Sequence, residues 1–430
     1  MQVGDTIMAL SSGALPAGVA VIRLSGPLVQ KSLDILAGGV PEPRKMVLRH
    51  IGADQRLDQG LVAFFPSPNS FTGEDCAELH VHGSVAGVKS ILAALRQQGL
   101  RLADAGEFTR RAFENGKLDL IAVEGLGDLL SADTEKQRQQ ALARYDGRLT
   151  REIEQWRETL LDLRAEIEAR LDFSDEGDVS EDLPEVWMVQ LADLEVTIAA
   201  ALASVDSGRI VREGIRVALA GAPNAGKSSL INALSKSDIA IVSDEAGTTR
   251  DVREVPLDIN GQLFILLDLA GLRETDSPAE AEGVRRAQEA IRDADILLWL
   301  RAPDIVDVAH PETQAKIVTI GTKADLGPII GVDLNLSTKT GAGLSDLIET
   351  LSMLGESLAG GEPSLISHER DRDSLVAALD ALLETQRSLH DWELSAESLR
   401  RASAALERMI GRLDAEKVLD RLFSSFCIGK

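Results

Sequence analysis

The segment 221–228 carries residue types that bind phosphate, and it reads G-A-P-N-A-G-K-S. Glycines at positions 221 and 226 let the backbone approach closely, so that successive N–H groups and a helix N-terminus point at phosphate oxygens. Lys227 supplies a positive charge and Ser228 a hydroxyl for Mg²⁺. The apolar run R-V-A-L-A precedes the segment and S-L-I-N-A-L follows it. This order predicts a buried strand, a phosphate-binding loop and a helix.

Two later segments add groups that would surround the phosphates. Residues 247–251 read G-T-T-R-D, and Thr249 can complete the Mg²⁺ shell beside Ser228. Residues 268–271 read D-L-A-G after a predicted strand. Asp268 can hold Mg²⁺ through water, and the Gly271 N–H can meet the γ-phosphate. Together these segments would report whether the γ-phosphate is present.

Residues 322–325, T-K-A-D, predict recognition of guanine. Asp325 can accept two hydrogen bonds from the ring N–H and amino group of guanine, which adenine does not offer, while the Lys323 stem can cover the base. Residues 337–339, S-T-K, fit a backbone contact to the guanine carbonyl. The motif usually begins with Asn, and the Thr322 hydroxyl is a poorer bridge to the phosphate loop, which bears on guanine affinity or selectivity.

Four motifs in this order predict a GTPase. The residues expected to bind GTP are Asn224, Ala225, Gly226, Lys227, Ser228, Ser229, Ser243, Gly247, Thr248, Thr249, Asp268, Gly271, Thr322, Lys323, Asp325, Ser337, Thr338 and Lys339. Mg²⁺ is expected on Ser228, Thr249 and Asp268. Arg250 is a candidate arginine finger, and a surface or switch-stabilising role fits it at least as well.

Alternating strands and helices over residues 211–361 predict a P-loop GTPase domain with a mostly parallel sheet and its ligand at the carboxyl ends of the strands. Residues 119–210 and 362–430 instead show apolar side chains at helical spacing. We expect these two regions to pack as one helical domain into which the GTPase domain is inserted, although two separate bundles would give the same periodicity. Residues 1–118 predict an α+β domain.

Composition limits the class of protein. With 69 acidic and 45 basic residues, the formal net charge is −24, which argues against whole-surface attraction to nucleic acid or membrane. An RNA contact would therefore need a local basic patch or a partner's surface. Cys76 and Cys427 cannot build a disulfide framework, and no apolar run approaches ~20 residues. These features indicate a reduced, cytoplasmic, soluble protein.

The combination of N-A-G-K-S with G-T-T-R-D, the helical flanks and the terminal F-C-I-G-K resembles the family of tRNA modification GTPases called MnmE or TrmE. The resemblance covers essentially the whole chain and includes R-L-S-G at 23–26, F-T-G-E-D at 71–75 and K-L-D-L at 117–120. It implies a homodimer, joined through the N-terminal domain, that works with the flavin-dependent partner MnmG on tRNA. Together they would add an aminomethyl or carboxymethylaminomethyl group to C5 of the wobble uridine.

The resemblance also implies activation by K⁺, which replaces the arginine finger when two nucleotide domains meet. Asn224 would bind K⁺ together with Ser243, Thr248 and the backbone of Glu245, and the added charge would offset negative charge that develops at the phosphates. The water-orienting glutamate of the family falls on Glu280, with Glu282 as its rival.

Members of the family bind a tetrahydrofolate one-carbon donor, 5,10-methylenetetrahydrofolate, or 5-formyltetrahydrofolate as an analogue. Arg23, Glu78, Lys117 and Lys430 match those contacts, because a carboxylate can accept from the pterin edge and cations can bind the glutamate tail. Taken alone, Arg23 and Glu78 would instead be assigned to a solvent-exposed sheet face. Cys427 either acts in the modification or is buried beside the folate. The family's H-G-G segment is H-G-S here, at 82–84.

Two other functions fit part of the sequence. A ribosome-assembly or translation GTPase would share the nucleotide motifs but would not need the N-terminal domain or F-C-I-G-K. A non-hydrolytic scaffold that binds folate and nucleotide would fit if Thr322 marked a loss of turnover.

Overall fold

The computed structural model describes residues 4–172, 182–236, 253–269, 285, 288–306, 309–361, 364–413, 418, 419, 422, 423, 426 and 429. The chain divides into two compact units. One contains residues 1–127 together with 406–430, and the other contains residues 128–405. The end of the chain therefore groups with its beginning.

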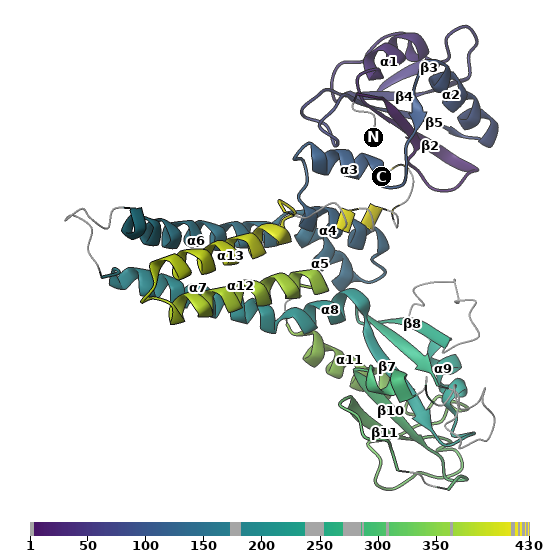
Figure 1. The fold of residues 1–430 in the computed structure, drawn as a ribbon. Helices are drawn as coiled ribbons and strands as arrows, with labels where there is room; N and C mark the ends of the chain where they lie inside the picture. Colours follow the sequence, from purple (N-terminus) through teal and green to yellow (C-terminus); the bar gives the residue numbers. More distant parts are fainter. Residues whose placement is uncertain are drawn as a thin grey trace. The chain divides into compact units, whose positions relative to one another are not determined.

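The first unit is built on a six-stranded sheet with the order β3-β4-β5-β2-β1-β6 (Figure 1). The strands are β1 (Ile7–Leu10), β2 (Ala17–Ser25), β3 (Val47–Ile51), β4 (Asp58–Phe65), β5 (Cys76–Gly83) and β6 (Arg101–Leu102). β1 and β6 are parallel, and the other neighbouring pairs are antiparallel. The register of β2 against β5 places Arg23 directly opposite Glu78.

Helices α1 (Val29–Ala37) and α2 (Val85–Gln97) cover one face of this sheet. Their buried leucine, isoleucine and valine side chains join the inward side chains of β2, β4 and β5 in one core. The alternation of polar and apolar residues along the strands therefore leaves the other face for charged groups, including Arg23 and Glu78.

Helices α3 (Glu107–Glu114) and α4 (Leu120–Ser131) follow the sheet. The last described residues of the chain pack here, because Phe423 and Phe426 join Leu120 and Val123 in a small core. Ser11 Oγ also donates a hydrogen bond of 2.9 Å to the carbonyl of Gly429, which ties the chain's end to the loop after β1.

The second unit contains a helical bundle and the nucleotide domain. The bundle consists of α5 (Glu135–Tyr145), α6 (Arg148–Asp172), α7 (Glu185–Ala203), α8 (Val205–Glu213), α12 (Glu369–Arg387) and α13 (Trp392–Met409). Figure 1 shows α6, α7, α12 and α13 running alongside one another. The alternative of two separate helical bundles is therefore wrong: the helices before and after the nucleotide domain pack together.

A buried ion pair joins the two halves of the bundle. Arg144 on α5 donates to Asp371 Oδ2 on α12 at 2.9 Å, and both side chains are fully buried. Burial alone would raise the pKa of Asp371, but attraction to Arg144, Arg370 and His368 outweighs it, and the pKa is lowered. The aspartate is thus held as a carboxylate.

The nucleotide domain has a six-stranded sheet with the order β12-β11-β10-β7-β9-β8. Its elements are β7 (Ile215–Gly221), α9 (Lys227–Ser235), β8 (Arg253–Ile259), β9 (Gln262–Asp268), β10 (Ile296–Arg301), β11 (Lys316–Gly321), β12 (Leu334–Asn335) and α11 (Leu344–Ala359). Only the β8–β9 pair is antiparallel among these described strands. The phosphate loop follows the central strand β7, where the chain order reverses, which is the usual position of a ligand in such sheets.

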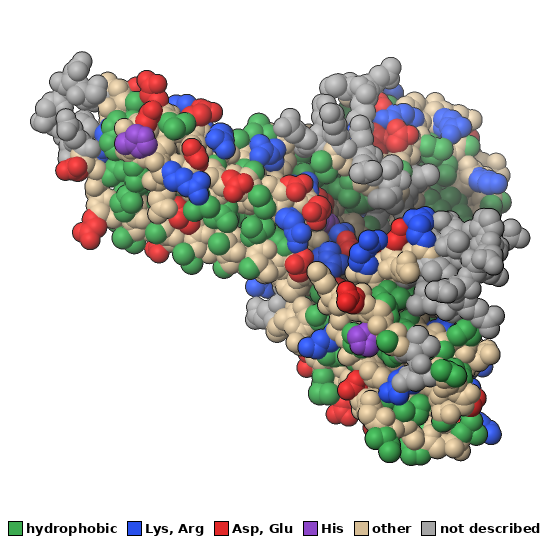
Figure 2. All heavy atoms as spheres, turned by 60° about the horizontal axis from the view of Figure 1, so that its bottom comes forward, with side chains coloured by type: hydrophobic (Ala, Val, Ile, Leu, Met, Phe, Trp, Pro, Cys, Tyr) green, Lys and Arg blue, Asp and Glu red, His purple; other side chains and the backbone are tan. Residues whose placement is uncertain are grey.

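Among the described helices, the stretch Glu185–Glu213, formed by α7 and α8, is long and apolar enough by length and composition to cross a membrane. Its side chains Trp187, Leu191, Leu194 and Ile198 are buried. On the face of the molecule drawn in Figure 2, acidic and basic side chains are interspersed with hydrophobic ones.

Candidate functional site

The phosphate loop joins β7 to α9 through backbone conformations that favour glycine. Gly221 has φ +148°, and a Cβ there would lie 2.3 Å from the carbonyl oxygen of Leu300, so a side chain is excluded. Gly226 has φ +99° and forms the N-cap of α9. The exposed Asn224 also has a positive φ, of +64°. The backbone conformation of the loop therefore depends on glycine at positions 221 and 226.

Lys227 lies folded back over this loop. Its Nζ donates to the carbonyls of Gly221 and Ala222 at 3.0 and 3.2 Å. Burial lowers the pKa of Lys227, and the nearby Asp268 carboxylate partly offsets that shift. The ammonium is thus positioned where the phosphates of a nucleotide would replace carbonyl partners with stronger, charged ones.

Two of the three expected Mg²⁺ ligands lie together. Ser228 Oγ donates to Asp268 Oδ2 at 3.1 Å, because β9 runs parallel to β7 and ends beside the start of α9. A hydroxyl and a carboxylate are hard oxygen ligands of the kind that Mg²⁺ takes together with phosphate oxygens and water. The donor set therefore fits Mg²⁺. Thr249, the third ligand, lies outside the described residues.

The base-recognition motif follows β11. Thr322 is 3% exposed, and its Oγ1 donates to the carbonyl of Ala225 in the phosphate loop at 2.7 Å and to that of Arg301 at 3.0 Å. Thr322 thus makes the bridge that an asparagine usually makes. One hydroxyl proton is shared between two acceptors, whereas an amide would supply two protons.

Asp325 and Lys323 are both held by neighbours. Ser337 Oγ donates to Asp325 Oδ1 at 2.7 Å, and this hydrogen bond keeps the pKa of Asp325 below its usual value. Lys323 Nζ lies 2.9 and 2.7 Å from the two carboxylate oxygens of Asp304. Lys339 Nζ lies 3.9 Å from Asp325 Oδ2. The motif therefore presents an ionised carboxylate for guanine.

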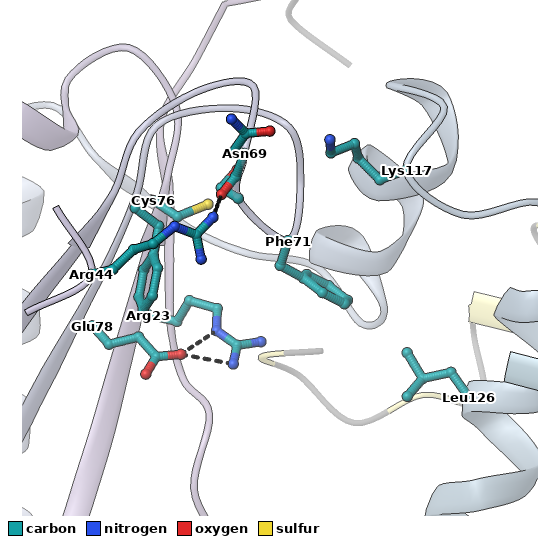
Figure 3. Close-up of a pocket in the computed structure, with 10 residues that line it drawn as sticks. Arg23, Arg44, Asn69, Phe71, Cys76, Glu78, Lys117 and Leu126 are labelled. Atoms are coloured by element: carbon teal, nitrogen blue, oxygen red, sulfur yellow. Dashed lines mark hydrogen bonds and ion pairs between the residues drawn. The ribbon is translucent and has the colours of Figure 1, made fainter. Parts of the chain in front are cut away.

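A second pocket, of about 670 Å³, lies in the first unit (Figure 3). It is lined by Arg23, Arg44, Phe65, Asn69, Ser70, Phe71, Cys76, Glu78, Lys117 and Leu126. Glu78 Oε1 accepts from Arg23 at 2.9 and 3.2 Å, and Oε2 lies 3.0 Å from His80 Nε2. Burial would raise the pKa of Glu78, but the hydrogen bonds from His80 and Arg23 outweigh it and lower the pKa.

The pocket has a charged end and a cationic rim. In Figure 3, Arg23 and Glu78 lie on one side, and Lys117 and Leu126 lie on the other. The structure thus brings three of the four predicted folate residues, Arg23, Glu78 and Lys117, to one cavity. The assignment of Arg23 and Glu78 to an open solvent face does not hold, because both line this cavity and are only about a quarter exposed or less.

Several predicted site residues lie outside the described part of the chain. They are Ser243, Glu245, Gly247, Thr248, Thr249, Arg250, Gly271, Glu280, Glu282, Cys427 and Lys430. Of the other predicted GTP-binding residues, Ser229 is exposed in the first turn of α9 and Thr338 follows Ser337 after β12.

Sequence reasoning missed Arg44 and Asp304. Arg44 has φ +62° and donates to the carbonyl of Asn69 across the pocket wall. A left-handed conformation at a non-glycine residue is uncommon, but no local sequence pattern announces it here. Asp304 reaches Lys323 only because β10 and β11 are neighbours in the sheet.

The sheet carries a phosphate loop, two ligands for Mg²⁺ and a guanine-recognition motif. Together these features define a P-loop GTPase. Comparison with known proteins gives a narrower assignment. The family model "MnmE helical domain" matches residues 120–427, and the model "GTP-binding protein TrmE N-terminus" matches residues 6–117. The chain belongs to the MnmE family of tRNA modification GTPases, and GTP hydrolysis with bound Mg²⁺ is its reaction.

Relatives align over the full length. The tRNA modification GTPase MnmE of Azorhizobium caulinodans is 49% identical over 436 residues, covering 99% of each chain. That of Rhizobium etli is 48% identical over 448 residues, covering 100% of each. Among solved structures, Aquifex aeolicus Era bound to GDP and AlF4⁻ is 23% identical with a TM-score of 0.27, over 40% of this chain and 66% of its own. The G domain of T. maritima FeoB is 25% identical with a TM-score of 0.24, over 33% and 98%.

Proposed function

We propose that this protein is a K⁺-dependent GTPase that works with the flavoprotein MnmG on tRNA in the cytoplasm. Together they add an aminomethyl or carboxymethylaminomethyl group to C5 of the wobble uridine, with a tetrahydrofolate derivative as one-carbon donor. The observation that carries the proposal is the second pocket. A GTPase that only switched would not need a cavity lined by Arg23, Glu78 and Lys117 in a separate unit.

The pocket suits a folate in size and in the order of its polar groups. Its volume of about 670 Å³ falls within the ~300–1,000 Å³ of small-molecule sites. Glu78 Oε1 accepts two hydrogen bonds from Arg23, whereas Oε2 has one described partner, His80, and keeps a lone pair for a donor of a pterin edge. Phe65 and Phe71 supply apolar wall, and Arg44 and Lys117 supply cations for a carboxylate tail. When bound, the folate would supply the one-carbon unit.

The four-part division of the chain, at 1–118, 119–210, 211–361 and 362–430, and the N-terminal homodimer belong to the same proposal. K⁺ binding is also part of the proposal. It is supported by Asn224, whose side chain is exposed within the phosphate loop. Ser243, Thr248 and the backbone of Glu245 complete the proposed K⁺ site. Glu280, with Glu282 as the rival, is proposed to orient the attacking water, and Lys430 is proposed to contact folate. For Cys427 both roles, in chemistry or in packing, are retained.

Nucleoside analysis tests the modification. Cells that lack this protein should lose the modified wobble uridine, and restoring the gene should return it. Replacement of Glu78 by Gln should leave GTP hydrolysis intact and lower the modification. A deletion strain without a paralogue that keeps normal wobble uridine would refute the proposal.

Hydrolysis assays test the ion separately. GTP turnover should rise strongly when Na⁺ is replaced by K⁺, and Asn224→Ala should remove most of that rise while nucleotide binding persists. Equal rates in the two salts would remove K⁺ from the mechanism without touching the folate pocket.

A further inference from the structure

The hairpin of β8 and β9 spans the nucleotide domain from its Mg²⁺ ligand to the helical bundle. At one end β9 finishes at Asp268, which accepts a hydrogen bond from Ser228. At the other end the strands are joined by the turn Asn260–Gly261. Each strand has seven residues, so the two ends lie roughly 20 Å apart at ~3.3 Å per residue.

The turn is tightly specified. Asn260 and Gly261 have φ of +53° and +78°, the left-handed pair that favours Asn-Gly in a two-residue hairpin turn. Gly261 N donates to Asp258 Oδ1 at 2.7 Å, and Asn260 Nδ2 donates to Ser352 Oγ on α11 at 2.8 Å. These contacts make the turn a firm end to the hairpin.

The Asn260–Gly261 turn of the hairpin packs directly against the first helical turn of α5. The Gly261 carbonyl accepts from the backbone N–H of Lys136 at 3.1 Å. N–H groups in the first turn of a helix have no partner inside the helix, so the hairpin completes the cap of α5. A Cβ built on Gly261 would lie 3.5 Å from Glu135 Cβ. The two backbones therefore touch with no side chain between them.

The start of α5 is also tied to the element that leads into the phosphate loop. Gln137 is 8% exposed; its Oε1 accepts from the backbone N–H of Thr134 at 3.1 Å, and its Nε2 donates to the Arg212 carbonyl at 2.8 Å. Arg212 is near the end of α8, directly before β7. Gln262, the first residue of β9, donates to the Ile210 carbonyl of α8 at 3.3 Å. The first turn of α5 thus contacts two elements that connect to the nucleotide site: the turn of the β8–β9 hairpin and the end of α8.

We propose that the β8–β9 hairpin carries the state of the nucleotide site to the helical bundle through the contact of Gly261 with the first turn of α5. Among the described strands, β8 lies at the edge of the sheet and pairs with β9 alone, so the hairpin is less restrained than the central strands. A shift of Asp268 on gain or loss of Mg²⁺ and the γ-phosphate is passed along β9 to the turn. There it displaces the carbonyl that caps α5.

Upstream, the same helix start is joined through a short connection to α4, which contributes Leu126 to the folate pocket. The step from hairpin to α5 rests on the GTPase activity alone. The onward step to the pocket rests also on the proposed function, and it regulates that same site.

Hydrogen exchange of the whole chain tests the first step. With GDP and then with a slowly hydrolysed GTP analogue, peptides that cover the first turn of α5 should exchange at rates that differ several-fold. Peptides from the middle of α6 serve as the control and should not change. Equal exchange at α5 in the two nucleotide states would overturn the proposal.

A reversible cross-link tests whether the contact itself carries the signal. The pair Glu135→Cys and Gly261→Cys has a Cβ–Cβ separation near 3.5 Å, at the short end of the ~3.5–4.5 Å that disulfides span. Each single variant and the reduced double variant are the controls. Oxidation should abolish the nucleotide-dependent exchange difference at α5 while GTP still binds, and dithiothreitol should restore it. An undiminished difference in the cross-linked protein would contradict the proposal.

The onward step is read from tRNA modification. The cross-linked protein should hydrolyse GTP but lose modification until it is reduced. If the wild-type chain with MnmG fails to modify tRNA, the proposed function is refuted. The hydrogen-exchange experiment would still test whether the hairpin transmits the nucleotide state to α5. Should modification be equal in the oxidised and reduced forms, the route to the pocket is refuted.

Discussion

Replacement of Thr322 by Val tests how the phosphate loop is held. The Thr322 hydroxyl joins the base-recognition motif to the phosphate loop, because it donates a hydrogen bond to the carbonyl of Ala225. Valine keeps the shape and removes the donor, leaving a carbonyl of a residue that is 1% exposed without this partner. Loss of one such bond costs about 1–3 kcal/mol. The hydroxyl has one proton, so the loss is counted once although two carbonyls lie within reach.

Hydrogen exchange over the loop measures this cost as a local opening free energy. At 1.4 kcal/mol per factor of ten, the Thr322→Val loop should exchange about 5- to 150-fold faster than wild type. Thr322→Ser keeps the hydroxyl and should exchange close to wild type. Thr322→Asn supplies two N–H donors and should slow the exchange. A Thr322→Val loop that exchanges within twofold of wild type would show that the bridge does not hold the loop.

Three further changes test other parts of the molecule. Asp371→Asn leaves Arg144 charged and buried without its carboxylate, and should lower the unfolding free energy by about 3–5 kcal/mol. Because the pKa of Asp371 is lowered in the folded state, its stabilisation is present above the usual value of 3.8 and is lost as pH falls below it, so the variant's urea midpoint should lose that pH dependence. Gly208→Ala puts a Cβ 2.1 Å from the Ile366 carbonyl oxygen and should lower the unfolding free energy by the roughly 1–3 kcal/mol typical of overpacking, which is measured as a lower melting temperature. Glu78→Gln should weaken binding of 5-formyltetrahydrofolate about tenfold, as loss of a charge-assisted hydrogen bond does, in a titration followed by calorimetry.

Matched variants separate these effects from general damage. Asp380→Asn changes an exposed carboxylate on the same helix as Asp371 and should leave the unfolding free energy unchanged. Gly361→Ala adds a Cβ with nothing within 4 Å, so a similar loss of stability in this variant would contradict the steric argument for Gly208. Glu114→Gln changes an exposed carboxylate of the first unit and should not weaken folate binding.

The sequence predicts elements best where a local pattern determines them. The run R-V-A-L-A, expected as a strand, lies within β7, and the run S-L-I-N-A-L, expected as a helix, lies within α9. Glycine spacing and the Lys-Ser pair also place the phosphate site, because the chemistry resides in consecutive residues.

Contacts between distant residues could not be predicted in this way. The run E-R-D-R-D at the start of α12 reads as a solvated helix end, yet Asp371 within it is fully buried because Arg144 lies more than 200 positions away in sequence. Arg44 reaches the pocket through a left-handed backbone that tertiary packing imposes. The seat of Gly261 on α5 depends on how the sheet meets the bundle, which no periodicity encodes.

The packing of residues 406–430 in the same unit as residues 1–127 affects the order in which the protein can fold during synthesis. The nucleotide domain is contiguous, so it can fold while translation continues. The first unit instead needs Phe423 and Phe426 to close the core around Leu120 and Val123, and roughly 280 residues separate its two segments. At about 5–20 residues per second, that core waits some 15–60 s for its last side chains. A ribosome that stalls after the nucleotide domain, while α12 or α13 is being made, would therefore carry a complete GTPase fold and an N-terminal unit that still lacks Phe423 and Phe426.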